Sequence, residues 1–145
     1  MAAALRVLNL DDNDAARYLR SRGLMRSGFE VIEAASGGEA LEIAQGAALD
    51  VAVLDVKLPD MSGLEVTQRL KADPMTSAVR IVQVSSVYLD AGTELESLRH
   101  GADIFLRLPV EDAALSTVVT TLAGMRAAQA ARFPNFLSHA AVNEG

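Results

Sequence analysis

The feature that most constrains the fold is a fivefold alternation of short apolar runs with segments of helical spacing. The runs that predict strands are residues 5–10, 29–34, 51–54, 81–84 and 104–106. The segments between and after them carry apolar residues three and four positions apart, the period of a helix with one buried face. Strands that alternate with helices predict a parallel sheet whose right-handed crossovers place helices on both faces. The expected fold class is therefore α/β, a doubly wound (βα)5 sheet of five parallel strands.

Local signals mark where several helices begin and end. Asn13 or Asp14 is the expected N-cap of a first helix that ends near Gly28. Ser36 and Glu39 have the spacing of a capping box and predict the start of a second helix. A later segment carries helix-spaced apolar residues at Ala91, Leu95, Leu98 and Ala102. The last helix has an apolar stripe made of Leu115, Val118, Val119, Leu122 and Met125.

Composition excludes several classes of function. Half of the 145 residues are hydrophobic, which allows a substantial core. The formal net charge of −6 argues against DNA or RNA as the main partner, because a polyanion would be repelled. There are no cysteines, so disulfides and thiolate chemistry are excluded. The start of the chain does not resemble a signal peptide, and the uncharged stretch 113–125 is too short to span a membrane. We expect a soluble, cytoplasmic domain.

Chemically useful side chains follow the predicted strands, at the sheet edge where such folds bind ligands. Asp11 and Asp12 follow the first strand, Asp55 ends the third, and Ser85 follows the fourth. Three converging carboxylates would repel one another, and one would stay protonated unless a cation neutralised them. Their hard oxygen ligands suit Mg²⁺, which takes one or two protein carboxylates, waters and phosphate oxygens. Beside such a metal, Asp55 can act as a nucleophile toward phosphorus while the metal screens the transferred charge.

Each of these residues also has a purely structural interpretation. Asp11 and Asp12 could simply begin a helix, where acidic side chains are favoured. Asp55 could be a solvated strand end, and Ser85 could cap a neighbouring amide. The occurrence of all four at the carboxyl ends of predicted parallel strands favours the functional interpretation. The lone histidines, His100 and His139, have no partner at metal-ligand spacing, so we assign them no metal.

The motifs at the strand ends resemble those of response-regulator receiver domains in two-component signalling. The similarity lies in Asp11-Asp12, the run Leu54–Gly63, Val84-Ser85-Ser86, and Gly101-Ala102-Asp103 before a strand ending in Pro109. The motifs stand in the family's order, and the match covers roughly residues 5–122. The resemblance implies a flavodoxin-like sheet with strand order 2-1-3-4-5. It also implies a receiver domain over residues 1–124, with 125–145 as a C-terminal helical extension or tail.

The resemblance also implies a metal site and a phospho-acceptor. Asp55 would take a phosphoryl group from a partner's phosphohistidine. Asp12 would bind Mg²⁺ (or Mn²⁺) directly and Asp11 mainly through water, with the backbone carbonyl of Lys57 as a further ligand. Such a domain would at most catalyse its own phosphorylation and dephosphorylation, with no turnover of a separate substrate.

Two further residues match the family's conformational switch. Ser85 would donate its hydroxyl to the phosphoryl group, and Phe105 would be the aromatic that turns inward in response. Phe105 also has a plain interpretation as a core residue. The switch would shift the face formed by the fourth helix, fifth strand and fifth helix.

The chain departs from the family at Leu108, where receivers normally carry a lysine that pairs with the phosphoryl group. A charge-assisted hydrogen bond contributes about 1.5–3 kcal/mol, so its loss predicts slower phosphorylation or weaker coupling rather than a dead site. Lys57 could swing toward the pocket and supply the missing charge, which we treat as a hypothesis. The family also carries a cis peptide at this step, so a cis Leu108–Pro109 bond is expected.

Three functions remain open on the sequence. The first is a working receiver in a phosphorelay, served by a histidine kinase or phosphotransfer protein and acting on a downstream protein. The second is a degenerate receiver that docks proteins without phosphorylation, which Leu108 favours. The third, a metal-dependent phosphatase with an aspartyl nucleophile, is disfavoured because no second acid stands two residues after Asp55. The segment Ala16–Arg22 and the loop Lys57–Gly63 also resemble receivers of hybrid histidine kinases. Family analogy allows a homodimer through helices four and five.

Overall fold

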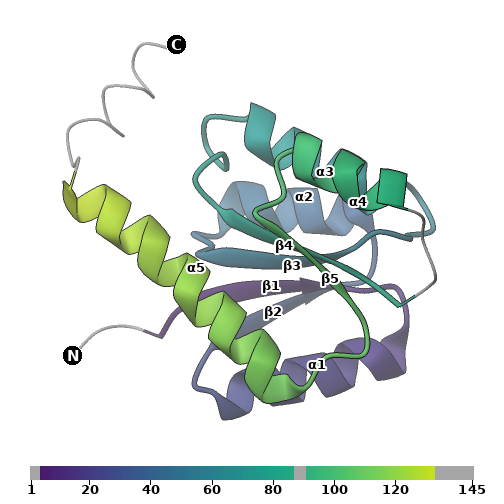
Figure 1. Ribbon diagram of the computed structural model, residues 1–145, viewed down its shortest axis with the longest axis horizontal. Helices are drawn as coiled ribbons and strands as arrows, with labels where there is room; N and C mark the ends of the chain where they lie inside the picture. The colour runs from purple at the N-terminus through teal and green to yellow at the C-terminus, as the bar shows by residue number, and fades with distance from the viewer. Residues whose placement is uncertain (1–3, 87–90, 133–145) are drawn as a thin grey trace.

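The computed structural model describes residues 4–86 and 91–132, and it contains a single parallel sheet (Figure 1). The sheet order is β2-β1-β3-β4-β5, which confirms the expected doubly wound topology. The strands are β1 (Arg6–Leu10), β2 (Glu30–Ala34), β3 (Val51–Asp55), β4 (Arg80–Ser85) and β5 (Ile104–Arg107). All four neighbouring pairs run parallel. The carboxyl ends of the strands therefore meet at one edge.

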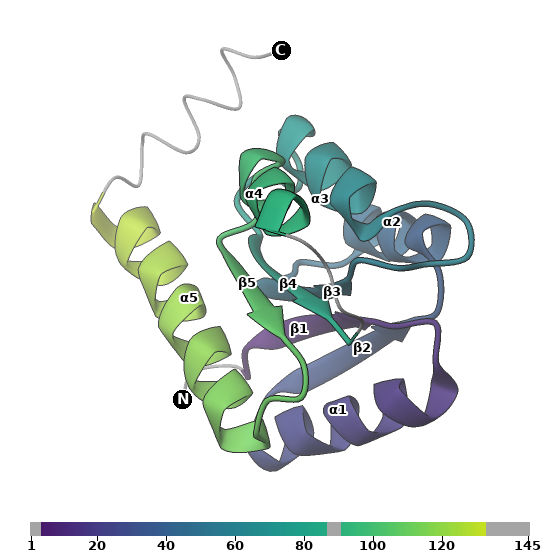
Figure 2. The same ribbon diagram turned by 45° about the vertical axis from the view of Figure 1, so that its right-hand side comes forward.

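Helices cover both faces of this sheet, as the alternating pattern predicts. They are α1 (Asp14–Arg26), α2 (Gly37–Gly46), α3 (Gly63–Ala72), α4 (Ala91–Arg99) and α5 (Asp112–Arg132). Figures 1 and 2 show α1 and α5 on one face, with α2, α3 and α4 on the other. In the described part of the chain, no helix is both long and apolar enough to cross a membrane.

Each face of the sheet has its own hydrophobic core. Leu8, Leu54 and Ile81 pack with residues of α2 and α3 on one face. Val7 and Val53 pack with residues of α1 and α5 on the other. β3 is buried along its whole length, as expected of a central parallel strand covered on both faces. The strand ends at this edge of the sheet are therefore anchored in two packed cores.

The sequence signals for helix starts are confirmed. The Asn13 side chain accepts a hydrogen bond from the amide of Ala16 at 2.8 Å, so Asn13 is the N-cap of α1. The Ser36 hydroxyl accepts from the amide of Glu39 at 3.2 Å at the start of α2. These bonds satisfy amide groups that have no partner within the helix.

Two apolar patterns have a different outcome from the expected one. Ala102 lies outside α4, which ends at Arg99, because Gly101 takes a φ of +109° that terminates the helix. Met125 is 51% exposed although it extends the apolar stripe of α5.

α5 continues to Arg132, while residues 133–145 of the predicted extension lie outside the described residues. The proposed boundary after residue 124 stays a prediction.

Candidate functional site

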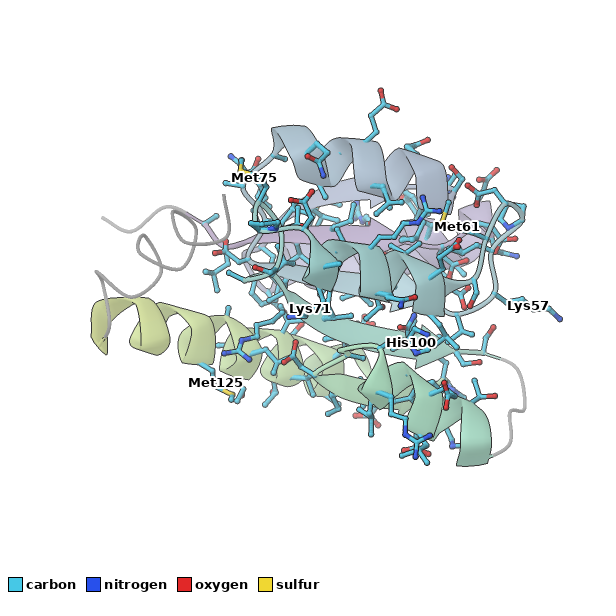
Figure 3. The ribbon with its side chains drawn as sticks, turned by 90° about the horizontal axis from the view of Figure 1, so that it is seen from above. Lys57, Met61, Lys71, Met75, His100 and Met125 are labelled. Atoms are coloured by element: carbon cyan, nitrogen blue, oxygen red, sulfur yellow. The ribbon has the colours of Figure 1, made fainter. Side chains whose placement is uncertain are left out.

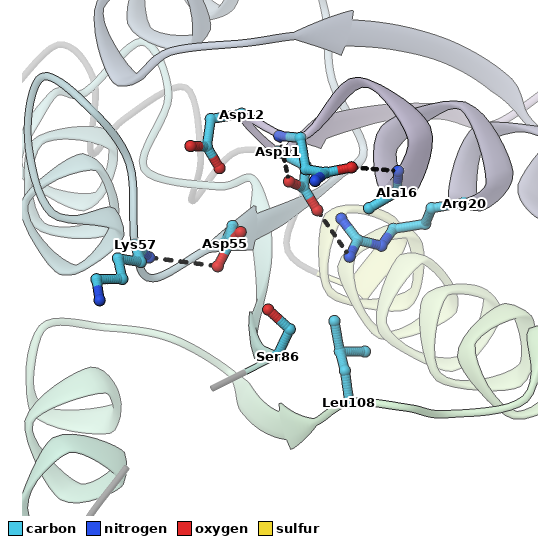
Figure 4. A pocket seen from close by; sticks show the side chains of 9 residues that line it. Asp11, Asp12, Ala16, Arg20, Asp55, Lys57, Ser86 and Leu108 are labelled. Atoms are coloured by element: carbon cyan, nitrogen blue, oxygen red, sulfur yellow. Dashed lines mark hydrogen bonds and ion pairs between the residues drawn. The ribbon is translucent and has the colours of Figure 1, made fainter. Parts of the chain in front are cut away.

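The carboxyl ends of four strands enclose an open cavity of about 560 Å³ (Figure 4). Asp11 and Asp12 follow β1, Asp55 ends β3, Ser86 follows β4, and Leu108 follows β5. All five residues line the cavity. The structure thus brings together side chains that are far apart in the sequence, at the edge where parallel α/β sheets bind ligands.

Three carboxylates form a cluster in this cavity. Asp11, Asp12 and Asp55 each offer one oxygen, and these oxygens lie within 4.8 Å of one another. Asp11 and Asp55 are buried, whereas Asp12 is exposed. Hard oxygen ligands of this kind, open to water on one side, fit a divalent cation such as Mg²⁺.

Asp55 is held at the floor of the cavity. Its side chain is mostly shielded from solvent, and one carboxylate oxygen accepts a 3.3 Å hydrogen bond from the amide of Lys57. Burial raises the pKa of Asp55 to about 6, and the amide of Lys57 opposes that rise. The negative charge of Asp11 raises the pKa further, while the positive charge of Arg20 lowers it. Repulsion between the carboxylates, which the sequence suggested, therefore raises the pKa of Asp55 less than burial does.

Asp11 is fixed by two contacts that leave it little freedom. One of its carboxylate oxygens accepts a hydrogen bond from the amide of Asn13 at 2.8 Å. The other pairs with the Arg20 guanidinium at 3.2 Å, and both side chains are less than a tenth exposed. Arg20 was not predicted as a site residue. Its position one helical turn after Arg17, on a helix that starts beside the acidic pair, is the signal that could have suggested it.

Lys57 points away from the carboxylates. Figure 3 shows its side chain extending out from the body of the protein, and Figure 4 shows its amide, but not its ammonium group, facing Asp55. The role of its backbone carbonyl as a metal ligand stays a prediction. The hypothesis that its ammonium group replaces the missing lysine stays a prediction.

The two serines after the fourth apolar run occupy different positions. Ser85 ends β4 and is buried, and its carbonyl accepts a hydrogen bond from the amide of Leu108 at 2.8 Å. Ser86 lines the cavity, and Figure 4 shows its hydroxyl turned toward Asp55. Sequence reasoning missed Ser86, although the Ser-Ser pair signalled that either hydroxyl could face the site.

The end of β5 differs from the family pattern in chemistry but keeps its backbone. Leu108 lines the cavity and packs against the core shared by α1 and α5. The Leu108–Pro109 peptide bond is cis. The neighbouring Arg107 turns toward α4 and pairs with Glu94 at 3.3 Å. Phe105 is buried.

Polar groups that the sequence did not single out fix the loop after Asp55. The buried Gln83 side chain donates to the carbonyl of Leu54 at 3.0 Å and accepts from the Thr67 hydroxyl at 2.7 Å. Asp60 accepts hydrogen bonds from the amides of Gly37 and Gly38 at 2.9 and 2.8 Å. The Gln83 contacts tie the end of β3 and the first turns of α3 to β4, and the Asp60 contacts tie the loop after Asp55 to the start of α2.

Comparison with known proteins agrees with this geometry. Residues 7–120 match the family model described as the response regulator receiver domain. The chain is 31% identical over 121 residues to Protein PilH of Pseudomonas aeruginosa, covering 82% of this chain and 98% of that protein. It is 38% identical over 104 residues to a cyclic di-GMP phosphodiesterase of Thermotoga maritima, covering 72% of this chain but only 27% of that protein.

Solved structures show the same fold. A CheY-like receiver domain protein from Methanospirillum hungatei superposes with a TM-score of 0.82 at 26% identity, over 88% of this chain and 99% of that one. A response regulator from Burkholderia pseudomallei, solved with a phosphorylated aspartic acid, a calcium ion and citrate, superposes with a TM-score of 0.74 at 26% identity. That match covers 86% of this chain and 72% of the other.

Proposed function

The chain belongs to the response-regulator receiver family, and from this premise we propose that it works as a phospho-accepting switch with Asp55 as the acceptor. The observation that carries the proposal is the placement of Asp55, buried at the floor of an open cavity beside Asp11 and Asp12. The phosphorylated aspartic acid of the related Burkholderia pseudomallei protein supports this assignment.

The proposed reaction is an in-line transfer from a phosphohistidine of a partner protein, in the cytoplasm. A carboxylate oxygen of Asp55 forms a bond to phosphorus while the bond between phosphorus and the histidine nitrogen breaks. The electron pair of that bond stays on the imidazole, which takes a proton from solvent. Asp55 must be deprotonated to attack, and a pKa of about 6 leaves it mostly ionised at neutral pH. The partner is a histidine kinase or a phosphotransfer protein.

The acidic cluster would hold Mg²⁺ or Mn²⁺. The metal supplies charge neutralisation for the transferred group and the aspartates. Asp12, the exposed member, and Asp55 would be the direct ligands, together with the carbonyl of Lys57. Asp11 already bonds Arg20 and the amide of Asn13, which supports its indirect role through water.

The response to phosphorylation would pass through a serine hydroxyl to Phe105 and then to the face of α4, β5 and α5. We assign the hydroxyl to Ser85 on the family's pattern, with Ser86 as its competitor because Ser86 lines the cavity. Ser85→Ala and Ser86→Ala separate the two assignments. The variant that weakens binding of a phosphoryl analogue identifies the donor.

A second candidate function is phosphorylation-independent docking, and Leu108 is the observation that favours it. Without a cation at residue 108, the affinity of the site for the phosphoryl group would be about tenfold to a hundredfold lower. A domain of this kind would bind its partner in one constant conformation.

The deciding experiment is amide NMR of the domain with Mg²⁺, before and after addition of beryllofluoride, a mimic of the aspartyl phosphate. The proposal predicts shifts at Asp12, Asp55 and the Ser85–Ser86 pair that spread to Phe105. Asp55→Asn is the control and should abolish them. Shifts confined to the cavity would indicate binding without a switch. No response at high Mg²⁺ would reject the phospho-acceptor and leave the docking module.

A further inference from the structure

The acidic cavity has an excess of negative charge. Leu108 does not offset this excess, whereas receivers normally carry a lysine at its position. Three carboxylates meet there, and Leu108 brings no positive charge to the side of the cavity that β5 forms. A divalent cation would neutralise only two of the three negative charges before a phosphoryl group adds more. A further cation must therefore serve the site if it binds phosphoryl groups well. Among the described residues that line the cavity, the cations are Arg20 and Lys57.

Arg20 reaches this cavity from the side of α1. Its side chain is only 8% exposed and shares the cavity wall with Asp55 and Leu108. Figure 4 shows its guanidinium beside Asp11, on the side of the cavity where Leu108 also lies, whereas Lys57 extends away on the opposite side. Arg20 is thus the cation that the fold directs into the site near the position of the missing lysine.

The guanidinium of Arg20 is held in place by the buried side-chain amide of Asn9. It donates to the side-chain oxygen of Asn9 at 3.1 Å. The Asn9 nitrogen in turn donates to the carbonyl of Arg17 at 3.0 Å and to the Ser21 hydroxyl at 2.9 Å. The Ser21 hydroxyl donates to Glu33 at 2.6 Å. Asn9 is fully buried within β1, so this network fixes Arg20 before any ligand arrives.

We propose that Arg20 supplies the positive charge that pairs with the phosphoryl group on Asp55, in place of the lysine absent at Leu108. This inference rests on the proposed function. A guanidinium has five N–H donors in a planar fork, so its bonds to Asn9 and Asp11 do not exhaust it. Three carboxylates, one guanidinium and a divalent cation balance to zero formal charge.

The competing interpretation is that Arg20 only positions Asp11, with which it forms a buried ion pair. The two interpretations differ in what they predict for metal binding.

The test measures beryllofluoride affinity at saturating Mg²⁺, and Mg²⁺ affinity alone, by NMR titration of the unsubstituted chain and of variants at Arg20, Arg22, Lys57 and Leu108. Arg20→Met removes the charge and keeps much of the volume. We expect a loss of about tenfold to a hundredfold in beryllofluoride affinity, the range for one charge-assisted hydrogen bond. Adding Leu108→Lys to Arg20→Met should restore part of that affinity. Arg20→Lys should keep more affinity than Arg20→Met. Arg22→Met, an exposed arginine on the same helix, is the matched control and should change nothing.

Mg²⁺ affinity separates the ligand role from the positioning role. Removing a cation beside three carboxylates should strengthen Mg²⁺ binding in Arg20→Met. A parallel loss of Mg²⁺ and beryllofluoride affinity would show that Arg20 only positions Asp11, and would overturn the inference. Equal beryllofluoride affinity in Arg20→Met and the unsubstituted chain would also overturn it, as would a loss in Lys57→Ala alone.

Two outcomes concern the proposed function and the fold. No beryllofluoride binding by the unsubstituted chain would reject the proposed function and this inference with it. Binding with the same affinity in the presence and absence of the Arg20 side chain would reject the inference alone.

If Arg20→Met does not fold, the beryllofluoride affinity of Leu108→Lys, made in the unsubstituted chain, decides. A site already served by Arg20 should gain little affinity from the added lysine. A gain of about tenfold or more would show that the charge was missing, and would overturn the inference.

Discussion

Gly63 lies directly against the main-chain carbonyl of Asp55, with no space for a side-chain carbon between them. A β-carbon at Gly63 would overlap the carbonyl oxygen of Asp55 and would lie 2.7 Å from the side-chain nitrogen of Gln83. The amide of Gly63 also donates to the carbonyl of Val56 at 2.7 Å. The first residue of α3 is therefore packed onto the strand end that presents the acceptor.

Gly63→Ala should destabilise the domain and disturb the site together. Overpacking of this kind costs about 1–3 kcal/mol, because the added methyl must displace the backbone of Asp55. Urea unfolding measures the loss, and beryllofluoride titration should show weaker binding. Gly46→Ala is the matched control, since nothing lies within 4 Å of a β-carbon there and alanine favours the helix. Equal stabilities of Gly63→Ala and the unsubstituted chain would contradict the close packing.

Thr67→Val should leave a buried acceptor without its donor. The Thr67 hydroxyl donates to the buried Gln83 side chain at 2.7 Å, and Gln83 bonds the carbonyl of Leu54, next to Asp55. An unsatisfied buried group costs about 1–3 kcal/mol. Urea unfolding of Thr67→Val, Gln83→Leu and the double variant measures the coupling. We expect the double variant to lose less than the sum of the single losses. Strict additivity would show that the two side chains do not act together.

The fold was largely predictable because its signals are local. The five apolar runs, the Asn13 and Ser36 caps and the loop chemistry after Asp55 all depend on residues a few positions apart, and the strands and caps occur as expected. Where a local pattern failed, another local feature prevailed. The positive φ of Gly101 ends α4 before Ala102 despite the helical spacing.

The residues that the sequence did not reveal are polar groups whose partners lie in other elements of the fold. Asn9 is an ordinary member of a strand run until Arg20, Ser21 and the carbonyl of Arg17 are placed around it. Gln83 is buried only because Thr67 and the carbonyl of Leu54 satisfy its amide. Periodicity reports which face a residue occupies, but it contains no information on such pairings.

Asp60 should titrate at a lower pH than an ordinary aspartate. Hydrogen bonds from the amides of Gly38 and Gly37 lower its pKa, because they stabilise the charged carboxylate. A lowered pKa in the folded state means that this contact stabilises the fold at neutral pH and is lost as the pH falls through the folded pKa. The amide shifts of Gly37 and Gly38 should follow this titration in NMR. The midpoint should disappear in Asp60→Asn, and a midpoint at or above the usual aspartate value of about 3.9 would contradict the contact.

Asp55→Asn should stabilise the metal-free domain at neutral pH. Burial raises the pKa of Asp55 from 3.8 to about 6, so the folded state holds this proton more tightly than the unfolded chain. Stability should therefore fall as the pH rises from about 4 to about 6, by up to roughly 3 kcal/mol for a shift of about two units. An uncharged asparagine avoids this cost. Urea unfolding in the presence of a chelator, at pH 4.5 and 7.5, measures both the gain and the flatter pH dependence.

The exposed Asp12 provides the control for this effect. Asp12→Asn removes one negative charge from the same cluster without relieving a burial cost, so its gain in stability should be smaller than that of Asp55→Asn. A larger gain in Asp12→Asn would show that repulsion between the carboxylates, and not burial, governs the site. Adding Mg²⁺ should reverse the ranking, because a cation that binds only the folded state stabilises the unsubstituted chain most. The same burial that makes Asp55 costly to ionise without a metal therefore predicts a strong thermodynamic link between metal binding and folding.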